Sequence, residues 1–322
     1  MLTDAFGRRF YYLRLSITEV CNFRCTYCLP NGYDGPPMSA FLSRPELERV
    51  MRVFAHLGTR KIRLTGGEPT LRADCTELIA AAKATPGIER VALTTNGYKM
   101  PQRVGQWRAA GLDQVNVSID SFDAEQFKAI TGHNRLQEIL AGLDAALAEG
   151  LEVKVNAVYM KGVNDQLPQF LNWLRTHPVT LRFIEVMEVG SIPEFYERHH
   201  VALSSMRQQL LLEGWQPVVK RVDAGPAQEF WHPHFAGRIG LIMPYSNDFC
   251  STCNRLRVSA QGKLHLCLFG EQGYDLRPWL QHDDQLPELV EVISQSLQHK
   301  TATHGLHERN PGMTRDLSML GG

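Results

Sequence analysis

The feature that most constrains the fold of this chain is a regular alternation of β-like runs and helix-like segments. The expected strands are six short runs, at 11–17, 61–65, 90–95, 114–119, 151–158 and 180–186. The expected helices lie between these runs, at 43–57, 76–83, 103–110, 136–149 and 165–176. Strand–helix repetition of this kind predicts a parallel sheet. About six such units are fewer than the eight of a closed barrel. We therefore predict an α/β fold, a partial and laterally open (βα)6 barrel of the TIM type, with an open doubly wound sheet as the competitor.

The segment 43–57 carries the clearest helix signals. Ser43 and Glu46 form a capping-box signature, and Pro45 stands in the first turn. Apolar residues then recur at helical spacing, at Leu47, Val50, Met51, Phe54 and Leu57. We therefore expect an amphipathic helix that begins next to Ser43.

The predicted strands carry polar residues on one of their two faces. In the first strand Leu13, Leu15 and Ile17 share one face, because side chains alternate along a strand. The polar face of this and other strands comprises Tyr12, Arg14, Ser16, Lys61, Arg63, Thr65, Asn116, Ser118, Lys154 and Asn156. A packed barrel lumen would be apolar throughout. A solvent-facing antiparallel sheet would also alternate, but the helical crossovers argue against it. We predict that the polar face lines a ligand cavity.

The seven cysteines form two groups of three, with Cys75 alone and expected to be structural. An odd number in a long chain disfavours a disulfide framework. The two groups of three thiols instead point to metal or iron–sulfur ligation. The first group, Cys21, Cys25 and Cys28, follows the first predicted strand with the spacing C-x3-C-x2-C. Three thiolates can hold three irons of a four-iron cluster and leave the fourth iron open. The alternative is a chance group of buried thiols or a zinc loop, although this loop contains no His, Asp or further Cys to complete a zinc site.

The second group of cysteines has the spacing C-x2-C-x13-C and comprises Cys250, Cys253 and Cys267. A β-like run follows Cys253, and a turn at 261–262 precedes a returning strand at 264–268. If these two strands pair, the three thiolates surround one point. Such a group again leaves one iron of a four-iron cluster open.

Two arginines and one histidine bear on the interpretation of this second group. Alternation places Arg255 and Arg257 on the same face as Cys253 and therefore beside the thiolates. Guanidinium groups bind phosphate bidentately, which weakens a purely structural interpretation. A zinc site with His265 as its fourth ligand is the rival.

The pattern changes after about residue 190, and we predict two regions, a barrel over 1–190 and a C-terminal region over 191–322 that carries the second cysteine group. In the second region 191–212 is expected to be helical, and short strands are expected at 215–221, 228–232 and 238–243. A helix at 286–297 and a polar tail that ends in Gly321 and Gly322 complete the chain.

Composition excludes several classes of protein. Apolar residues make up 43% and charged residues 21%, which is ordinary for a globular chain and excludes disorder. Lys plus Arg and Asp plus Glu both number 34, so the net charge of zero gives no support for a nucleic-acid or membrane partner. No apolar run approaches the length of a membrane span, and 1–9 has no signal-peptide core. We expect a cytoplasmic protein.

The first cysteine group, with the aromatic Tyr27 before Cys28, resembles the radical S-adenosylmethionine (SAM) superfamily. Gly66-Gly67-Glu68-Pro69, after the second predicted strand, is similar to the superfamily's GGEP motif, which holds the amino group of SAM. Two glycines permit a close backbone approach to a ligand. In this superfamily the open iron binds SAM, and one-electron reduction then releases a 5′-deoxyadenosyl radical.

Nearly the whole chain further resembles the GTP 3′,8-cyclase family, that of molybdenum cofactor biosynthesis protein A. The motifs that carry the resemblance are CNFRCTYC at 21–28, LTGGEP at 64–69, TTNG at 94–97, NVSID at 116–120, RFIE at 182–185, FCSTCNRLR at 249–257 and GKLHLC at 262–267, with Gly321 and Gly322 at the end. The second cysteine group with its arginines and the diglycine end point to this family rather than to the superfamily alone.

The resemblance implies two [4Fe-4S] clusters, held by Cys21, Cys25 and Cys28 and by Cys250, Cys253 and Cys267. SAM would lie at the first cluster, near Tyr27, Gly67, Ser118 and Met187. GTP would lie between the clusters with its guanine near the open iron of the second, in contact with Arg14, Arg63, Thr94, Lys154, Arg182, Arg255 and Arg257. The tail, with Gly321 and Gly322, would reach into the active site.

The reaction that the resemblance implies is the first step of molybdenum cofactor biosynthesis. The deoxyadenosyl radical abstracts the hydrogen at C3′ of the GTP ribose, and the C3′ radical adds to C8 of guanine. Reduction and protonation give (8S)-3′,8-cyclo-7,8-dihydroguanosine 5′-triphosphate. A partner, cyclic pyranopterin monophosphate synthase, would convert this product. The family also implies a reductant protein of unknown identity and a homodimer.

Three other functions stay open at this point. A radical SAM enzyme that modifies a peptide or another small molecule would use the second cluster for electron transfer, but the C-terminal region has no cysteine beyond three. A non-catalytic iron–sulfur carrier would not need a GGEP motif or a cationic cavity. A zinc-stabilised binding module would contain zinc instead of iron and sulfide, which metal analysis distinguishes.

Overall fold

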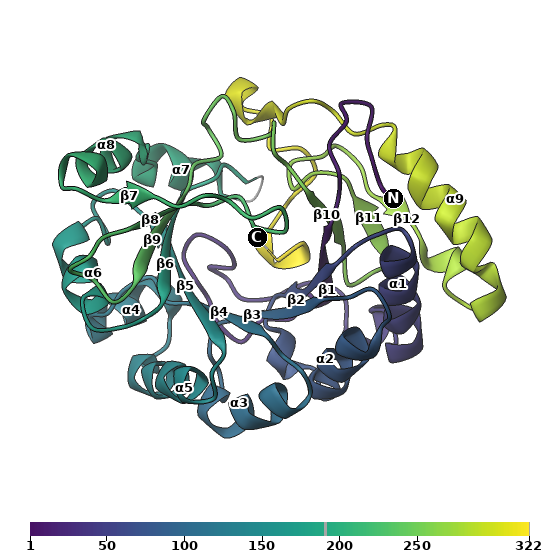
Figure 1. The fold of residues 1–322 in the computed structure, drawn as a ribbon, viewed down its shortest axis with the longest axis horizontal. Helices are drawn as coiled ribbons and strands as arrows, with labels where there is room; N and C mark the ends of the chain where they lie inside the picture. The colour runs from purple at the N-terminus through teal and green to yellow at the C-terminus, as the bar shows by residue number, and fades with distance from the viewer. Residues whose placement is uncertain (190–191, 322) are drawn as a thin grey trace.

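The strands of this protein form one continuous sheet that curls around a central space (Figure 1). In a computed structural model, which describes residues 1–189 and 192–321, the sheet has twelve strands in the order β12-β11-β10-β1-β2-β3-β4-β5-β6-β9-β8-β7. Strands β12 and β7 stand at the two ends of this order. The described strands therefore form a laterally open barrel.

The six central strands are parallel and agree with the six expected runs to within one or two residues. They are β1 (Tyr12–Thr18), β2 (Lys61–Gly66), β3 (Arg90–Thr95), β4 (Gln114–Ser118), β5 (Glu152–Tyr159) and β6 (Thr180–Glu185). The helices between them are α1 (Arg44–His56), α2 (Cys75–Ala84), α3 (Met100–Ala109), α4 (Ala124–Thr131), α5 (Leu136–Ala148) and α6 (Leu167–Leu174). These helices lie along the outer face of the curved sheet (Figure 1), which confirms the partial (βα)6 barrel and not a doubly wound sheet.

The C-terminal region extends the sheet on both sides of the barrel. On one side β9 (Arg238–Ile242) runs parallel to β6, followed by antiparallel β8 (Gln228–Trp231) and β7 (Gln216–Pro217). On the other side β10 (Arg255–Val258) runs parallel to β1, followed by antiparallel β11 (Lys263–His265) and β12 (Tyr274–Asp275). The strand pair expected after Cys253 is confirmed, with Arg257 opposite His265.

The remaining helices are α7 (Pro193–His199), α8 (Ser204–Leu212) and α9 (Leu286–Leu297). The helix expected over 191–212 is two helices, because the backbone of His200 is extended and ends α7. Helix α4 was not expected, although Asp123 caps it by accepting from the N–H of Gln126 at 2.8 Å. The strand expected over 215–221 is only the two-residue β7. The predicted boundary at 190 and 191 lies outside the described residues, and the division into two regions stays a prediction.

The alternation along the strands sorts side chains between the core and the interior of the barrel. Leu13, Leu15 and Ile17 are completely buried and belong to the same core as Phe54 of α1. Helix α1 begins as expected, with the N–H of Ser43 donating to the Glu46 carboxylate at 2.7 Å. Among the described residues, no helix combines the length and apolarity needed to span a membrane.

Candidate active site

Three cavities follow one another along the inside of the barrel. The upper cavity, about 130 Å³, lies at the carboxyl ends of the central strands and is lined by the first cysteine group. The middle cavity, about 80 Å³, is lined by the second cysteine group. The lower cavity, about 810 Å³, lies near the amino ends of the strands, where Lys61, Arg90 and Glu152 begin β2, β3 and β5.

Shared wall residues connect these cavities into one path. Asn156 and Met187 line both the upper and the middle cavity, and Arg63 and Arg182 line both the middle and the lower cavity. The polar strand face lines this path as predicted, through Tyr12, Arg14, Lys61, Arg63, Thr65, Ser118, Lys154 and Asn156. A ligand in the middle cavity would therefore have access to both ends of the barrel.

The first cysteine loop is anchored to the strands by Tyr27. Its hydroxyl donates to Oδ2 of Asp120 at 2.9 Å, and Oδ1 of Asp120 accepts from the N–H of Val158 at 2.8 Å. Burial raises the pKa of Asp120 to about 6, although both hydrogen bonds act in the opposite direction. The loop is thus held against the carboxyl ends of β4 and β5, with Tyr27 and Ser118 lining the upper cavity.

The three cysteines of this loop are partly buried. Burial raises the pKa of Cys21 to about 11 and that of Cys28 to about 12, and it raises the pKa of Cys25 well above the usual value. These groups are therefore protonated at neutral pH in the cluster-free protein, and binding of iron must displace their protons.

Gly66 and Gly67 bring the end of β2 against the segment that precedes the cysteine loop. A Cβ on Gly66 would lie 1.9 Å from the carbonyl oxygen of Thr18, and one on Gly67 would lie 2.4 Å from those of Glu19 and Val20. The sequence predicted a close approach of these glycines to a ligand. The structure shows that the close contact with the chain's own backbone requires glycine at both positions. Gly67 also lines the upper cavity.

The second cysteine group differs from the first because positively charged side chains lie next to it. Burial opposes ionisation of Cys253, but the charges of Arg255 and Lys300 outweigh it and lower the pKa of Cys253 to about 6. Burial raises the pKa of Cys250. Lys300 is buried, and its ammonium donates to the carbonyl of Leu266, the residue before the third cysteine of the group.

His265 does not join the second cysteine group. A Cβ on Gly273 would lie 2.8 Å from its Cε1 atom, which places the imidazole against that turn instead of in the lining of the middle cavity. Burial, with the charge of Arg257, lowers the pKa of His265 to about 4. The structure gives no support to the zinc interpretation with this histidine as fourth ligand. Within the described chain no three His, Cys, Asp or Glu side chains are placed to hold a single metal ion.

The middle cavity is surrounded by buried guanidinium groups, those of Arg14, Arg63, Arg182, Arg255 and Arg257. Among the described residues that line it there is no carboxylate. The Nε atoms of four of these arginines, Arg63, Arg182, Arg255 and Arg257, make no hydrogen bond within the described chain. Burial lowers the pKa of Arg182 to about 10. Buried N–H donors without hydrogen-bond acceptors are costly, so this arrangement indicates a site for an anionic ligand.

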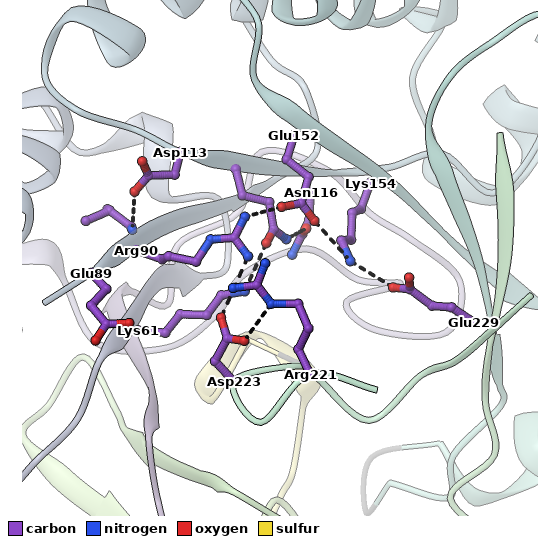
Figure 2. Close-up of polar contacts among 12 residues, drawn as sticks. Lys61, Glu89, Arg90, Asp113, Asn116, Glu152, Lys154, Arg221, Asp223 and Glu229 are labelled. Carbon is purple, nitrogen blue, oxygen red and sulfur yellow. Dashed lines mark hydrogen bonds and ion pairs between the residues drawn. The ribbon is translucent and has the colours of Figure 1, made fainter. Parts of the chain in front are cut away.

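Ion pairs line the lower cavity (Figure 2). Lys154 lies between Glu229, at 2.8 Å, and Glu152, at 3.2 Å. Arg90 contacts Glu152 as well and lies 3.7 Å from Asp223. The structure thus places Lys154 on the cavity wall, as expected, but already paired with carboxylates.

Two further groups, Lys61 and Asp120, were given no individual role at the site from the sequence. Lys61 is buried and donates to Oε1 of Gln114 at 2.9 Å (Figure 2), and burial lowers the pKa of Lys61 to about 6. Its position on the polar strand face was the signal that could have identified it. Asp120 ends the motif at 116–120, but nothing in the sequence indicates that Tyr27 is its partner.

The tail and Thr94 both lie at the upper cavity. Gly321 has φ +60°, and a Cβ on it would lie 2.2 Å from Oγ1 of Thr65. Gly322, also expected at the site, lies outside the described residues. Thr94, expected to contact GTP, lines the same cavity as the residues expected to bind SAM, and its hydroxyl accepts from Asn116 at 3.3 Å.

Comparison with known proteins identifies the family. The model of the Radical SAM superfamily matches residues 15–174, and that of Molybdenum Cofactor Synthesis C matches 179–306. The chain is 55% identical to the GTP 3′,8-cyclase of Vibrio atlanticus, over 99% of this chain and 97% of that protein. It is 56% identical to the GTP 3′,8-cyclase of Yersinia pestis, over 100% of this chain and 99% of that protein. This chain belongs to the GTP 3′,8-cyclase family.

Solved structures of other radical SAM proteins share the fold of this GTP 3′,8-cyclase family member. SuiB of Streptococcus suis, determined with bound S-adenosylmethionine, matches with a TM-score of 0.66 and 13% identity, over 97% of this chain and 77% of SuiB. The protein anSMEcpe, determined with bound AdoMet, matches with a TM-score of 0.55 and 14% identity, over 87% of this chain and 83% of that protein. At this level of identity the likeness shows the fold alone.

Membership of the GTP 3′,8-cyclase family fixes the cofactors. Radical SAM enzymes use a [4Fe-4S] cluster and SAM, and this family carries a second cluster. The donor sets fit these groups, because each set of three thiols lines a cavity instead of converging on one point. The cations around the second set also fit an anionic substrate beside its cluster.

Proposed function

We propose that this chain cyclises GTP by joining C3′ of the ribose to C8 of guanine. The family's activity supports the reaction, and the observation that carries the substrate is the ring of buried arginines around the middle cavity. The four guanidinium groups without Nε partners are those of Arg63, Arg182, Arg255 and Arg257. A triphosphate supplies the anionic oxygens that these groups lack, and each charge-assisted bond is stronger in a dry cavity than in water.

The nucleotide needs more room than the middle cavity offers. Ligand sites typically have volumes of about 300–1,000 Å³, and the middle cavity has only about 80 Å³. The lower cavity, with about 810 Å³, shares Arg63 and Arg182 with it. We therefore place GTP across both, with Arg14, Lys154 and the two shared arginines on its phosphates and sugar.

At the inner end of this site the guanine would face the second cysteine group. Arg255 and Arg257 on β10 lie beside Cys253, and Tyr12 occupies the equivalent position to Arg255 on β1. In this proposal Cys250, Cys253 and Cys267 would hold the second cluster, which would supply a binding site for the guanine. Thr94 lies on the side of the sugar that faces SAM, in agreement with its place in the upper cavity.

SAM would lie in the upper cavity, with the first cluster held by Cys21, Cys25 and Cys28. When bound, the cluster and SAM supply a carbon radical. Tyr27, Gly67, Ser118 and Met187 line that cavity and would orient SAM, while Met187 also faces the middle cavity. Gly321 would close the space around SAM and exclude water from the radical.

The other partners follow from the family and not from the fold. We propose that the enzyme acts in the cytoplasm as a homodimer and takes electrons from a reductant protein. Its product would pass to cyclic pyranopterin monophosphate synthase. The formal charge of zero gives no reason to add a nucleic acid or a membrane to these partners.

Replacement of Arg255 tests the nucleotide site. Arg255→Ala should lower GTP turnover at least about 100-fold, by analogy with the loss of one preorganised charge donor, with iron and sulfide content unchanged. Arg255→Lys keeps the positive charge but loses the bidentate geometry of the guanidinium group. Its GTP turnover should therefore lie between that of Arg255→Ala and that of the parent enzyme. Loss of half of the iron in Arg255→Ala would contradict the proposal, because the arginine would then support the cluster instead of the substrate.

A further inference from the structure

A cationic groove lies on the outer side of the second cysteine group. It has a volume of about 320 Å³ and is lined by Arg8, Arg9, Tyr11, Lys220, Arg221, Val222 and residues 251–254. There is no carboxylate among these described lining residues. Three segments far apart in the sequence build the groove, namely the N-terminal arm, the loop after β7 and the second cysteine loop.

Some of the cations in this groove hold its walls together, and others are available to a partner. Arg8 donates to the carbonyl of Cys250 at 3.1 Å, which fixes the N-terminal arm against the cysteine loop. Arg221 pairs at 3.1 Å with an aspartate of its own loop. Arg9 and Lys220 are exposed, and neither forms an ion pair with any residue that the structure describes.

An apolar residue lies among these charges. The side chain of Val222 is 73% exposed, and the loop that carries it is held from below by Asn254, whose amide donates to the Val222 carbonyl at 2.7 Å. Val222 would give a docked protein one apolar contact among the charged side chains of the groove.

Cys253 separates this groove from the substrate path. It lines the groove on the outside and the middle cavity on the inside. One residue of the second cysteine group thus faces both solvent and the proposed nucleotide site. A molecule seated in the groove would therefore contact Cys253 directly.

The proposed reaction needs electrons from outside the enzyme. One electron releases the radical from SAM, and a second electron and a proton complete the cyclised nucleotide. The second electron is needed at the nucleotide, which lies across the Cys253 wall from the groove in the arrangement proposed above.

We propose that this cationic groove is the docking site of an acidic one-electron carrier protein, which gives up beside Cys253 the electron that the nucleotide needs. The inference rests on the proposed function for the need for electrons and for the position of the nucleotide. The positive charge of the groove favours a partner that carries acidic residues around its redox centre. Complexes of this kind are small, short-lived and steered by charge, so we expect binding that weakens steeply with salt.

The test compares two electron donors on the cluster-loaded enzyme. Reduced flavodoxin serves as the acidic carrier, and dithionite serves as a small reductant that needs no docking surface. The variant Arg9→Glu/Val222→Glu reverses one charge of the groove and adds another. We expect it to lose about tenfold or more of the flavodoxin-driven rate and of the flavodoxin affinity at low salt, and to keep its dithionite-driven rate.

The matched control is Arg108→Glu/Leu212→Glu, which makes the same change in charge. It replaces an exposed arginine of α3 and an 89% exposed leucine of α8, both remote from β10 (Figure 1). Affinity is measured by titration calorimetry of enzyme with flavodoxin, which reports docking independently of catalysis. The control should keep both the flavodoxin affinity and both rates.

The outcomes separate this inference from the proposed function. Unchanged flavodoxin affinity and rate in the groove variant would overturn the docking site, as would an equal loss in the control. Loss of the dithionite-driven rate with full iron content would overturn it too, because the groove would then serve the substrate. If the parent enzyme converts SAM but leaves GTP intact, the proposed function fails, and docking is still decided by the flavodoxin affinities.

Discussion

Cys28 and Cys253 show how strongly nearby charges change the pKa of a cysteine thiol. Both are largely buried, yet burial raises the pKa of Cys28 to about 12 while Arg255 and Lys300 lower that of Cys253 to about 6. The thiolate is the form that binds iron and that reacts with electrophiles. The two cysteine groups therefore differ in how readily they ionise before any cluster is present.

Alkylation of the cluster-free protein tests this difference. The rate for Cys253 should rise with pH through about 6 and level off above pH 7, because its thiolate fraction is then complete. Cys21 and Cys28, with pKa values of about 11 and 12, should react slowly up to pH 9. Peptide mapping by mass spectrometry after iodoacetamide pulses measures each site separately. A Cys253 midpoint above pH 8 would contradict the electrostatic account.

The chemistry-bearing residues of the site could be recognised from the sequence to different extents. The cysteines stand out by spacing, and Arg63, Arg255 and Arg257 stand out by their place on polar strand faces. Lys61 lies on such a face as well, but its burial depends on neighbouring strands that no local pattern reveals. The contact of Tyr27 with Asp120 joins residues that are 93 positions apart, so only the fold could show it.

At the scale of elements, the junction between β2 and the cysteine loop is the tightest contact of the site. The N–H of Gly67 donates to the carbonyl of Thr18 at 3.0 Å, and that of Glu68 donates to Val20 at 2.8 Å. Side chains at 66 or 67 would separate these two segments. The glycines are thus needed to place the first cysteine loop over the end of the sheet.

Gly67→Ala tests this junction against a helical glycine. Its Cβ would collide with two backbone carbonyl oxygens, so we expect a loss of about 1–3 kcal/mol in the free energy of unfolding and a lower iron content at the first site. Gly105→Ala in α3 is the control, since its Cβ would have only an ordinary contact at 3.5 Å. That variant should gain up to about 1 kcal/mol. Equal urea midpoints for the two variants would contradict the steric argument.

Secondary structure was most predictable where one physical signal dominated. The central strands combine alternation with flanking turns, and α1 and α9 have strong apolar stripes, so their positions agree closely with expectation. The helix α4 is short and carries mixed residues, and the break between α7 and α8 depends on the backbone of His200. Both depend on tertiary packing more than on local preference.

For the whole molecule, the decisive feature is that both chain regions build one sheet. Strand β10 pairs with β1 and thereby sets Arg255 beside Tyr12 and Arg257 beside Arg14. The second cysteine group is brought to the barrel by this pairing, across more than 200 positions of sequence. The sequence predicted the open barrel and the polar interior, but a long-range parallel pair leaves no local pattern from which to predict it.

The connected cavities inside this sheet link the two cysteine groups. The upper cavity holds the first cysteine group and the middle cavity the second, and Asn156 and Met187 face both. A nucleotide placed between the two groups would meet SAM on one side and the buried arginines on the other. We therefore propose that the interior path brings GTP and SAM together.

The measurement that tests this claim most directly is an anaerobic reaction of cluster-loaded enzyme with SAM and dithionite, with and without GTP. Mass spectrometry follows 5′-deoxyadenosine and any cyclised nucleotide. We predict that both products form together and that their formation depends on GTP. 5′-Deoxyadenosine with GTP left intact would contradict the assignment of the substrate, and the absence of both products with iron present at both sites would contradict the catalytic account itself.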